Sequence, residues 1–312
     1  MTALVAAGLL FLTGCGGDRS ADQAAGKRLS IATGNTTGVY YVLGGGLADQ
    51  IGKNIPGYQA TAEATGASVE NIQRIVRGDS DIAFTLADSA ADAVTGRGAF
   101  TTPQPIRAVA RLYDNHTQVV ATTGSGVKSV ADLRGKRVST GSPNSGTEVI
   151  ALRLLKAAGL DPEEDVTRQS LGLPESVQAL KDGDLDALVW SGGLPTPGIT
   201  DLLTSLSGQV AFVPLDGVLP AMRAEHGSVY APGTIAKNVY DTPSDVSTIS
   251  VTNLLVVPEK MDPALVESLT RLLFERRAEL EKIHPVAREI SRDNAPKTEP
   301  VPLHDGARKY YG

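Results

Sequence analysis

The chain has 312 residues, of which 41% are hydrophobic and 4% aromatic, and its formal net charge is −6. This length and apolar content allow more than one compact lobe, each with its own core. The acidic balance argues against sequence-independent binding of nucleic acid, which requires a basic surface.

The first residues read MTALVAAGLLFLTGC and contain an uncharged apolar run at 3–12. This run is too short to cross a bilayer and is typical of a signal-peptide core, so we exclude residues 1–14 from the fold. The LTGC stretch resembles the bacterial lipobox, which implies that Cys15 is lipidated and anchors the protein to the cell membrane. A free thiol is the alternative, because Cys15 has no second cysteine to pair with. Residues 15–26 then form a flexible tether.

The mature chain opens with KRLSIATGNTTGVY, residues 27–40. We expect a strand at Leu29–Ala32, a loop of small and hydroxyl residues, and then a helix. A second helix, with Ser68 as its N-cap and Gly78 just past its end, precedes a strand over Ile82–Leu86. Alternating strands and helices indicate parallel strands with right-handed crossovers. One face of the first helix carries Tyr40, Leu43, Leu47 and Ile51.

The same unit occurs a second time as KRVSTGSPNSGTEV, residues 136–149. It predicts a strand at Arg137–Thr140 and a helix from about Thr147 to Ala158. RIVRGDSDIA and ALKDGDLDALV form another matched pair, in which Asp79/Asp81 and Asp184/Asp186 are expected to end a helix and start a strand. The matched pairs lie about 105 to 110 residues apart, which suits two similar α/β lobes rather than a solenoid.

Two further segments are expected to connect the lobes. Strands are predicted at Ile106–Leu112 and Gln118–Thr122, with 113–116 as the crossover between them. A strand at Ile249–Val257 and an amphipathic helix after it return the chain to the first lobe, with the second crossing around Ser244–Thr248. We therefore expect two hinge crossings. The predicted division is lobe 1 at 27–113 and 247–312, and lobe 2 at 114–246.

The repeated loops are the first candidate binding residues. Each loop lies where a parallel strand ends and a helix begins, an edge at which open α/β sheets bind ligands. Its backbone N–H groups are available to an anion. Charge-assisted hydrogen bonds of about 1.5 to 3 kcal/mol each suffice for a micromolar carboxylate, which needs about 8 kcal/mol. A plain strand-to-helix connection is the alternative. The candidates are Gly34, Asn35, Thr36, Thr37, Gly38, Tyr40, Asn144, Ser145, Gly146 and Thr147.

Three other places add candidates. Thr65–Ser68 is a third small-residue helix start, for which a plain N-cap is the alternative. Trp190 follows a lobe 2 strand and either stacks on a ligand or fills the core. Asp88, at the matching place in lobe 1, either accepts a hydrogen bond from an ammonium group or is a solvated surface residue. The added candidates are Thr65, Gly66, Ala67, Ser68, Asp88, Trp190 and Ser191.

No catalytic residue, metal site or cofactor is expected. The four histidines are scattered, with no H-E-x-x-H pattern and no cysteine cluster. There is no G-x-S-x-G elbow, and neither loop has a nucleotide-binding glycine pattern. An enzyme on the same two lobes is the alternative class of function.

The sequence resembles the TAXI family, the extracytoplasmic solute receptors of TRAP transporters, which are tripartite, ATP-independent and periplasmic. The resemblance is spread over nearly all of the mature chain. It rests on IATGNTTGVYYVLGGGLADQI, ATGASVENIQRIVRGDSDIAF, KRVSTGSPNSGTEVIALRLLKAAGL, LKDGDLDALVWSGGLPTPGI, HPVAREISRDNA and PVPLHDGARKYY.

This resemblance implies a type II periplasmic-binding-protein fold with a central ligand cleft. It also implies that a small carboxylate-bearing solute, such as glutamate or another organic acid, is delivered to an ion-driven membrane permease. Where many relatives have Gln-Ser-Asp after the third strand, this chain has Leu86-Ala87-Asp88, and the solute is therefore left open. We expect a monomer that closes its lobes on the solute and does not bind nucleic acid. A receptor for an ATP-driven importer and a sensor domain are the alternatives.

Overall fold

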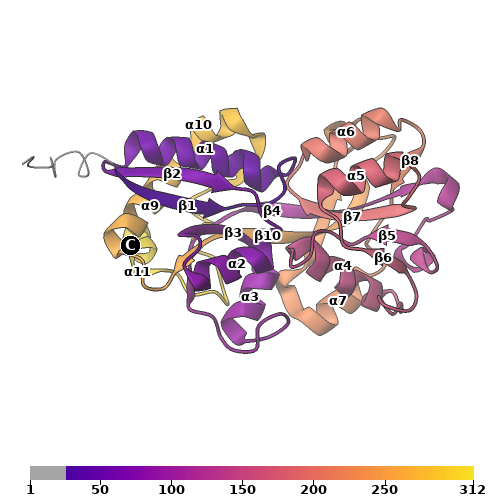
Figure 1. Ribbon diagram of the computed structural model, residues 1–312, viewed down its shortest axis with the longest axis horizontal. Helices are drawn as coiled ribbons and strands as arrows, with labels where there is room; N and C mark the ends of the chain where they lie inside the picture. The colour runs from indigo at the N-terminus through magenta and orange to yellow at the C-terminus, as the bar shows by residue number, and fades with distance from the viewer. Residues whose placement is uncertain (1–25) are drawn as a thin grey trace, which may run out of the picture.

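One twisted sheet runs through the long axis of the molecule and joins two α/β lobes (Figure 1). The structure is a computed structural model and describes residues 26–312. The predicted signal peptide, Cys15 and the tether up to residue 25 lie outside the described residues. Within the described part, the strand order is β2-β1-β3-β10-β4-β7-β5-β6, with β8 paired to β4 and β9 to β10.

Lobe 1 is built from both ends of the described chain. Its elements are β1 (Lys27–Ala32), α1 (Val39–Asn54), β2 (Tyr58–Glu63), α2 (Ser68–Arg77), β3 (Ile82–Leu86), α3 (Ala87–Thr95), α9 (Pro263–Glu275), α10 (Arg277–Ile283), the short helix η4 (Pro285–Glu289) and α11 (Asp305–Tyr311). β1 pairs in parallel with both β2 and β3, as the alternation predicted. The predicted inner face of α1 is confirmed, because all four of its residues are buried.

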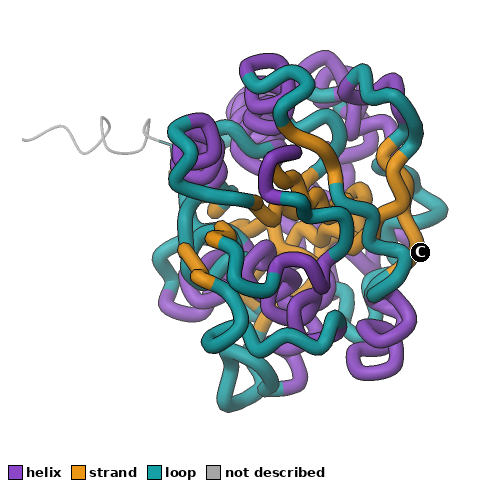
Figure 2. Tube along the Cα trace, turned by 90° about the vertical axis from the view of Figure 1, so that its right-hand side faces the viewer, coloured by secondary structure: helices purple, strands orange, loops and turns teal. Residues whose placement is uncertain are grey.

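Lobe 2 repeats this arrangement with the middle of the chain. Its elements are η1 (Thr123–Ser125), η2 (Val130–Leu133), β5 (Arg137–Ser139), α4 (Gly146–Ala157), β6 (Thr167–Gln169), α5 (Leu173–Lys181), β7 (Ala187–Gly192), α6 (Pro197–Ser205), β8 (Val210–Phe212), α7 (Leu219–His226), η3 (Gly227–Val229), β9 (Ala231–Ile235) and α8 (Lys237–Tyr240). β5 pairs in parallel with β6 and β7. Helices cover both faces of the strands (Figure 2), and each lobe has an apolar cluster on either face.

The duplication extends to single hydrogen bonds. The Asp81 carboxylate accepts from the Ser30 amide at 2.8 Å, and the Asp186 carboxylate accepts from the Arg137 amide at the same distance. Asp81 directly precedes β3 and binds β1, and Asp186 directly precedes β7 and binds β5. The interpretation of the Gly-Asp-x-Asp pairs as the starts of strands is therefore confirmed.

Two long strands connect the lobes, β4 (Ile106–Thr122) and β10 (Val246–Pro258). The strands predicted at Ile106–Leu112 and Gln118–Thr122 form one strand, because the residues at 113–116, predicted as the crossover between them, continue it, and 114–116 pair with β10. The second crossing lies later in the chain than predicted, because Val246–Thr248 pair with β9 of lobe 2. β10 passes from the lobe 2 core, which holds Val251, to the lobe 1 core, which holds Leu254. The hinge is thus an antiparallel pair of continuous strands.

Ser68 is also placed differently from the prediction. It is the first residue of α2, and Ala67, with φ of 85°, takes the N-cap position. The Ser68 hydroxyl accepts from the Leu86 amide at 3.1 Å and so links α2 to the end of β3. In residues 26–312, no helix is both long enough and apolar enough to span a membrane, and no group of three or more metal-ligating side chains occurs.

Candidate functional site

A small cavity of about 30 Å³ lies between the lobes, where the ends of β1, β3 and β7 meet the starts of α1, α2 and α4. Most of the predicted candidates line it. Lobe 1 contributes Gly34, Asn35, Gly38, Tyr40, Gly66, Ala67 and Ser68. Lobe 2 contributes Ser145, Gly146, Thr147, Trp190 and Ser191. The two repeated loops therefore face each other across one enclosed space.

Four predicted loop or helix-start residues do not line this cavity. Thr36 and Asn144 are exposed at the rim, and the Asn144 carbonyl accepts from the Glu70 amide of the other lobe at 3.0 Å. The Thr37 carbonyl accepts from the lobe 2 amide of Gly198 at 3.3 Å. Thr65 has a local role, because its hydroxyl donates to Asn71 at 2.6 Å. Of these four residues, Asn144 and Thr37 therefore make hydrogen bonds between the lobes.

Sequence reasoning missed several lining residues. Ser142 and Val39 lie in or beside the repeated loops, so the same repeat in the sequence could have identified them. Asn115 lines the cavity from the middle of β4, and it was missed because its segment was interpreted as a crossover between two strands. Leu86, Gly192 and Gly193 complete the wall.

The loops of the two lobes are in direct contact. A Cβ added at Gly146 would lie 2.6 Å from both the Leu86 Cδ1 atom and the Ser68 hydroxyl oxygen. A Cβ at Gly66 would lie 2.9 Å from the Pro143 carbonyl. Since real Cβ contacts under 3.0 Å essentially never occur, glycine permits this approach of the two lobes.

Asn35 makes the central polar contact between the lobes. Its Oδ1 accepts from the Leu173 amide at 2.7 Å, and its Nδ2 donates to the Ser142 hydroxyl at 3.2 Å. Both partners belong to lobe 2. Together with the two rim bonds, this contact shows that the structure has the lobes closed over the cavity.

A chain of buried polar groups crosses the hinge behind the cavity. The Tyr40 hydroxyl donates to Asn253, whose amide donates to the Asn115 Oδ1 at 2.8 Å. The Asn115 amide in turn donates to the Ser191 carbonyl at 3.2 Å. Burial raises the pKa of Tyr40 well above its ordinary value, so the phenol remains a neutral donor. This network fixes the cavity wall to both hinge strands.

Trp190 belongs to both the cavity wall and the core. It is 9% exposed, and its indole nitrogen donates to Thr196 at 3.2 Å. A Cβ added at Gly38 of lobe 1 would lie 3.2 Å from the ring. The ring also packs with Leu173 and Ile199 in lobe 2. Stacking of a solute on this ring stays a prediction.

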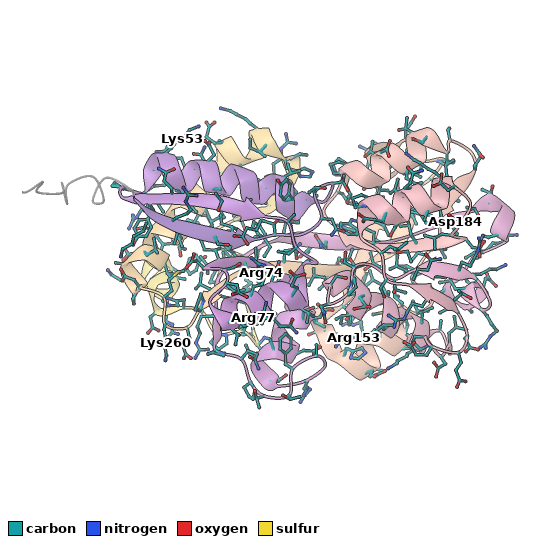
Figure 3. The ribbon with its side chains drawn as sticks, viewed as in Figure 1. Lys53, Arg74, Arg77, Arg153, Asp184 and Lys260 are labelled. Atoms are coloured by element: carbon teal, nitrogen blue, oxygen red, sulfur yellow. The ribbon has the colours of Figure 1, made fainter. Side chains whose placement is uncertain are left out.

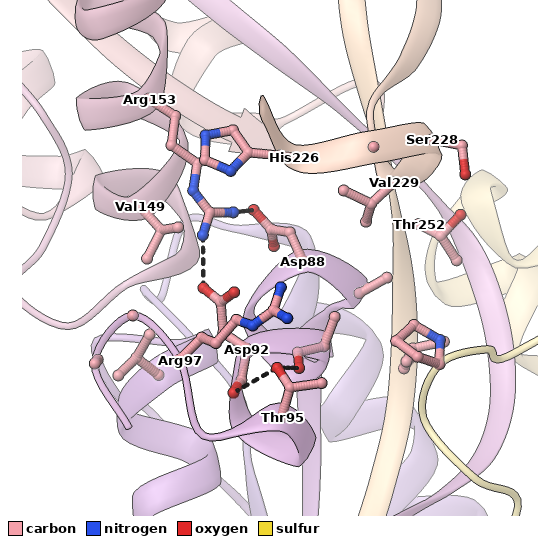
Figure 4. Close-up of a pocket in the computed structure, with 18 of the residues that line it drawn as sticks. Asp88, Asp92, Thr95, Arg97, Val149, Arg153, His226, Ser228, Val229 and Thr252 are labelled. Carbon is pink, nitrogen blue, oxygen red and sulfur yellow. Dashed lines mark hydrogen bonds and ion pairs between the residues drawn. The ribbon is translucent and has the colours of Figure 1, made fainter. Parts of the chain in front are cut away.

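Asp88 does not line the small cavity. It lies in the first turn of α3, beside a larger open cavity of about 1040 Å³ (Figure 4). Asp88 is 1% exposed, so it is not a solvated surface residue either. Its carboxylate accepts from the Tyr230 hydroxyl at 2.8 Å and lies 3.5 Å from Arg153, both in lobe 2. Burial raises the pKa of Asp88, and Arg153 opposes that shift.

Arg153 joins the two lobes through ion pairs. It lies near the boundary between them, whereas Lys53 and Lys260 lie at the outer surface (Figure 3). Its guanidinium also contacts Asp92 at 2.6 Å. The side chains of Arg153 and Asp92 are 15% and 18% exposed, so this is a largely buried contact rather than a surface ion pair.

Two α/β lobes joined by two long strands and closed over a cavity are the architecture of the periplasmic solute-binding proteins, which confirms the predicted fold. The chain belongs to the NMT1-like family, whose sequence profile matches residues 31–312. A solved protein from Bordetella bronchiseptica RB50 is similar, with 19% identity and a TM-score of 0.57 over 91% of this chain and 81% of that one.

Two further solved structures share the fold. The binding protein component of an ABC phosphonate transporter from Pseudomonas aeruginosa has 14% identity and a TM-score of 0.58 over 85% of this chain and 80% of that one. A Prochlorococcus marinus protein in complex with methylphosphonate has 10% identity and a TM-score of 0.57 over 85% of this chain and 91% of that one. At these identities, the likeness concerns the fold.

Proposed function

We propose that the chain is an extracytoplasmic solute-binding receptor of a TAXI-type TRAP transporter. It captures a small carboxylate-bearing solute, either a glutamate-like amino acid or an organic acid, and delivers it to the membrane permease. The observation that carries the proposal is the pair of repeated loops, one from each lobe, that line one enclosed cavity. A binding role needs no catalytic group, and we propose none.

The cavity suits a small anion because three helices begin at its wall. α1, α2 and α4 begin at Val39, Ser68 and Gly146, which all line the cavity. Each helix start stabilises a negative group by about 0.3 to 1 kcal/mol, and each charge-assisted hydrogen bond adds about 1.5 to 3 kcal/mol. Three or four such bonds meet the roughly 8 kcal/mol that micromolar affinity requires.

Binding is proposed to shift an equilibrium between open and closed lobes. The solute binds lobe 1 first, and the loop at Asn144–Thr147 then closes on it as the hinge strands bend. Trp190, the single tryptophan of the chain, lies in the cavity wall and contacts Gly38 of the other lobe. Its fluorescence should therefore report closure.

The test is a thermal-shift screen of carboxylates followed by tryptophan fluorescence and small-angle scattering. We expect solutes that raise the melting temperature to change the Trp190 emission and to lower the radius of gyration. A solute that stabilises the protein without either change would contradict closure. Turnover of the solute would instead favour an enzyme.

The partner is proposed from the resemblance to TAXI receptors, and an ABC importer is the second candidate because one similar solved structure is named as a component of such a transporter. Uptake into proteoliposomes that contain the permease and this receptor separates the two. Transport driven by an ion gradient without ATP supports TRAP, whereas a requirement for ATP supports an ABC importer. A sensor domain would support neither form of uptake.

We also propose that the receptor is a monomer, held at the membrane through lipid on Cys15, with residues up to 26 as a tether. A single short acyl chain binds membranes only marginally, so the anchor needs more than one chain. Cys15→Ala should release the protein from the membrane fraction without changing solute affinity. Retention of that variant in the membrane would contradict the anchor.

A further inference from the structure

We infer that the cavity between the lobes selects acids that carry only hydrogen-bond acceptors, such as 2-oxo acids, over their amino acid counterparts, and that Ser191 is a specificity-determining residue. This inference deepens the proposed function and rests on it. It narrows the solute from carboxylates in general to carboxylates without an ammonium group.

The first observation is the charge of the wall. Among the described residues that line the cavity, none is Asp, Glu, Lys, Arg or His. The carboxylate that was predicted to accept from an ammonium group is that of Asp88, which points to Arg153 beside the larger cavity (Figure 4). It also accepts from the Tyr230 hydroxyl. An ammonium group enclosed here would therefore lose its water without gaining a counter-ion.

The second observation is the direction of the hydroxyl groups in the wall. The Ser68, Ser145 and Thr147 oxygens each accept from a backbone amide, those of Leu86, Glu148 and Ser191, at 3.1, 2.9 and 3.2 Å. In the described part of the chain, neither the Ser145 nor the Thr147 hydroxyl donates to a protein acceptor, whereas Ser68 also forms a side-chain hydrogen bond with Tyr40. The protons of Ser145 and Thr147 are thus left to donate to a solute, alongside the amides of the helix starts.

The third observation is Ser191 itself. It is 6% exposed, lines the cavity, and its hydroxyl oxygen is buried with no hydrogen-bond partner among the described residues. Buried hydroxyls are normally paired, so this one is available to a solute. Its own backbone amide and carbonyl are already engaged with Thr147 and Asn115, which fixes its position in the wall.

Together these features make a wall rich in donors and free of carboxylates. A carboxylate and a neighbouring carbonyl oxygen can accept from such a wall at every position. An ammonium group brings three donors and a charge into the same place, and an uncompensated buried charge costs enough to weaken binding by about 100-fold or more. The cavity volume of about 30 Å³ also favours the smallest acids.

The experiment is isothermal titration calorimetry of the full chain with three matched pairs. These are pyruvate and L-alanine, 2-oxobutyrate and L-2-aminobutyrate, and 2-oxoglutarate and L-glutamate. We expect at least one oxo acid to bind about 100-fold more tightly than its amino partner. A preference of tenfold or more supports the inference, and a smaller preference or the reverse order overturns it while leaving the proposed receptor function intact. If no carboxylate binds at all, the proposed function fails, and the inference fails with it.

Ser191→Ala tests the assigned residue. We expect the oxo acid to bind about 10- to 100-fold more weakly, because a hydrogen bond to a charged group is lost. The melting temperature without solute should stay the same or rise, since the variant removes an unpaired buried hydroxyl. A merely structural role would lower the melting temperature and leave the affinity unchanged.

Thr117→Val is the matched control. Thr117 pairs with Ser191 across β4 and β7, and its hydroxyl is also buried without a partner, but it does not line the cavity. We expect its loss to change the oxo acid affinity by less than about twofold. If Ser191→Ala has no larger effect on affinity than Thr117→Val, the assignment of Ser191 is overturned.

Discussion

Gly146→Ala should weaken solute binding without destabilising either lobe. Gly146 is the first residue of α4, and its added Cβ would lie 2.6 Å from Leu86 and Ser68, both in lobe 1. Apolar carbons pack best at about 3.5 to 4.0 Å, so one side has to move. The conflict exists only when the lobes are closed, because both of its partners belong to the other lobe.

The expected magnitude follows from overpacking. Forcing an extra methyl group into a packed contact costs about 1 to 3 kcal/mol, which corresponds to a loss of affinity of about 5- to 150-fold. Within lobe 2, alanine is the better helix former by up to about 1 kcal/mol, so the lobe itself should be no less stable. The variant should therefore lower solute affinity, which depends on closure, without lowering the stability of the folded lobes.

The assay combines titration calorimetry with thermal unfolding of the solute-free protein. Gly45→Ala is the control, because Gly45 lies within α1 and a Cβ there would meet nothing within 4 Å. We expect the control to bind like the wild type. Tight binding by Gly146→Ala, equal to that of Gly45→Ala, would refute the argument that closure brings these two loops into contact.

Three more predictions follow from the contacts between the lobes. Arg153→Met should destabilise the closed protein in urea unfolding by about 3 to 5 kcal/mol, because it leaves the buried Asp88 carboxylate unpaired, and adding Asp88→Asn should recover part of the loss. Burial lowers the pKa of His284 from 6.5, and the contact of its ring with the Pro195 carbonyl at 3.0 Å opposes this shift. The unfolded chain then binds more protons than the folded one, so the free energy of unfolding should fall as the pH drops below about 6.5, and His284→Asn should show a weaker fall between pH 7.5 and 5.5. Finally, the uncharged wall predicts a dissociation constant that changes less than about twofold between 50 and 500 mM NaCl, and a steep salt dependence would instead indicate a Lys or Arg contact.

The parts of the site that sequence could predict are local. The repeated loops, the alternating strands and the Gly-Asp-x-Asp pairs are each visible as a short pattern in the sequence, although the aspartates bind Ser30 and Arg137 on strands far from them in the chain. Gly159, with φ of 75°, lies just past the end of α4, which agrees with the predicted end of this helix at about Ala158.

The parts that sequence could not predict depend on distant partners. Asn115 and His116 belong to the predicted crossover, yet they continue β4 because both pair with β10 and the Asn253 amide donates to the Asn115 side chain. The sequence pattern places Asp88 and Trp190 at matching positions, but Trp190 lies within β7, whereas α3 begins directly after β3 and directs the Asp88 carboxylate towards Arg153. Neither outcome can be inferred without the tertiary structure.

The place of β10 in the sheet has a consequence for the synthesis of the protein. This strand lies between β3 and β4, yet it is encoded after all of lobe 2. The central strand of the sheet is therefore the last strand to be synthesised. In a nascent chain that stops before residue 246, β3 and β4 are two separate sheet edges, whereas β10 joins them in the finished receptor. Such a chain exposes the inner edges of β3 and β4, which are the positions at which unwanted strand pairing would begin.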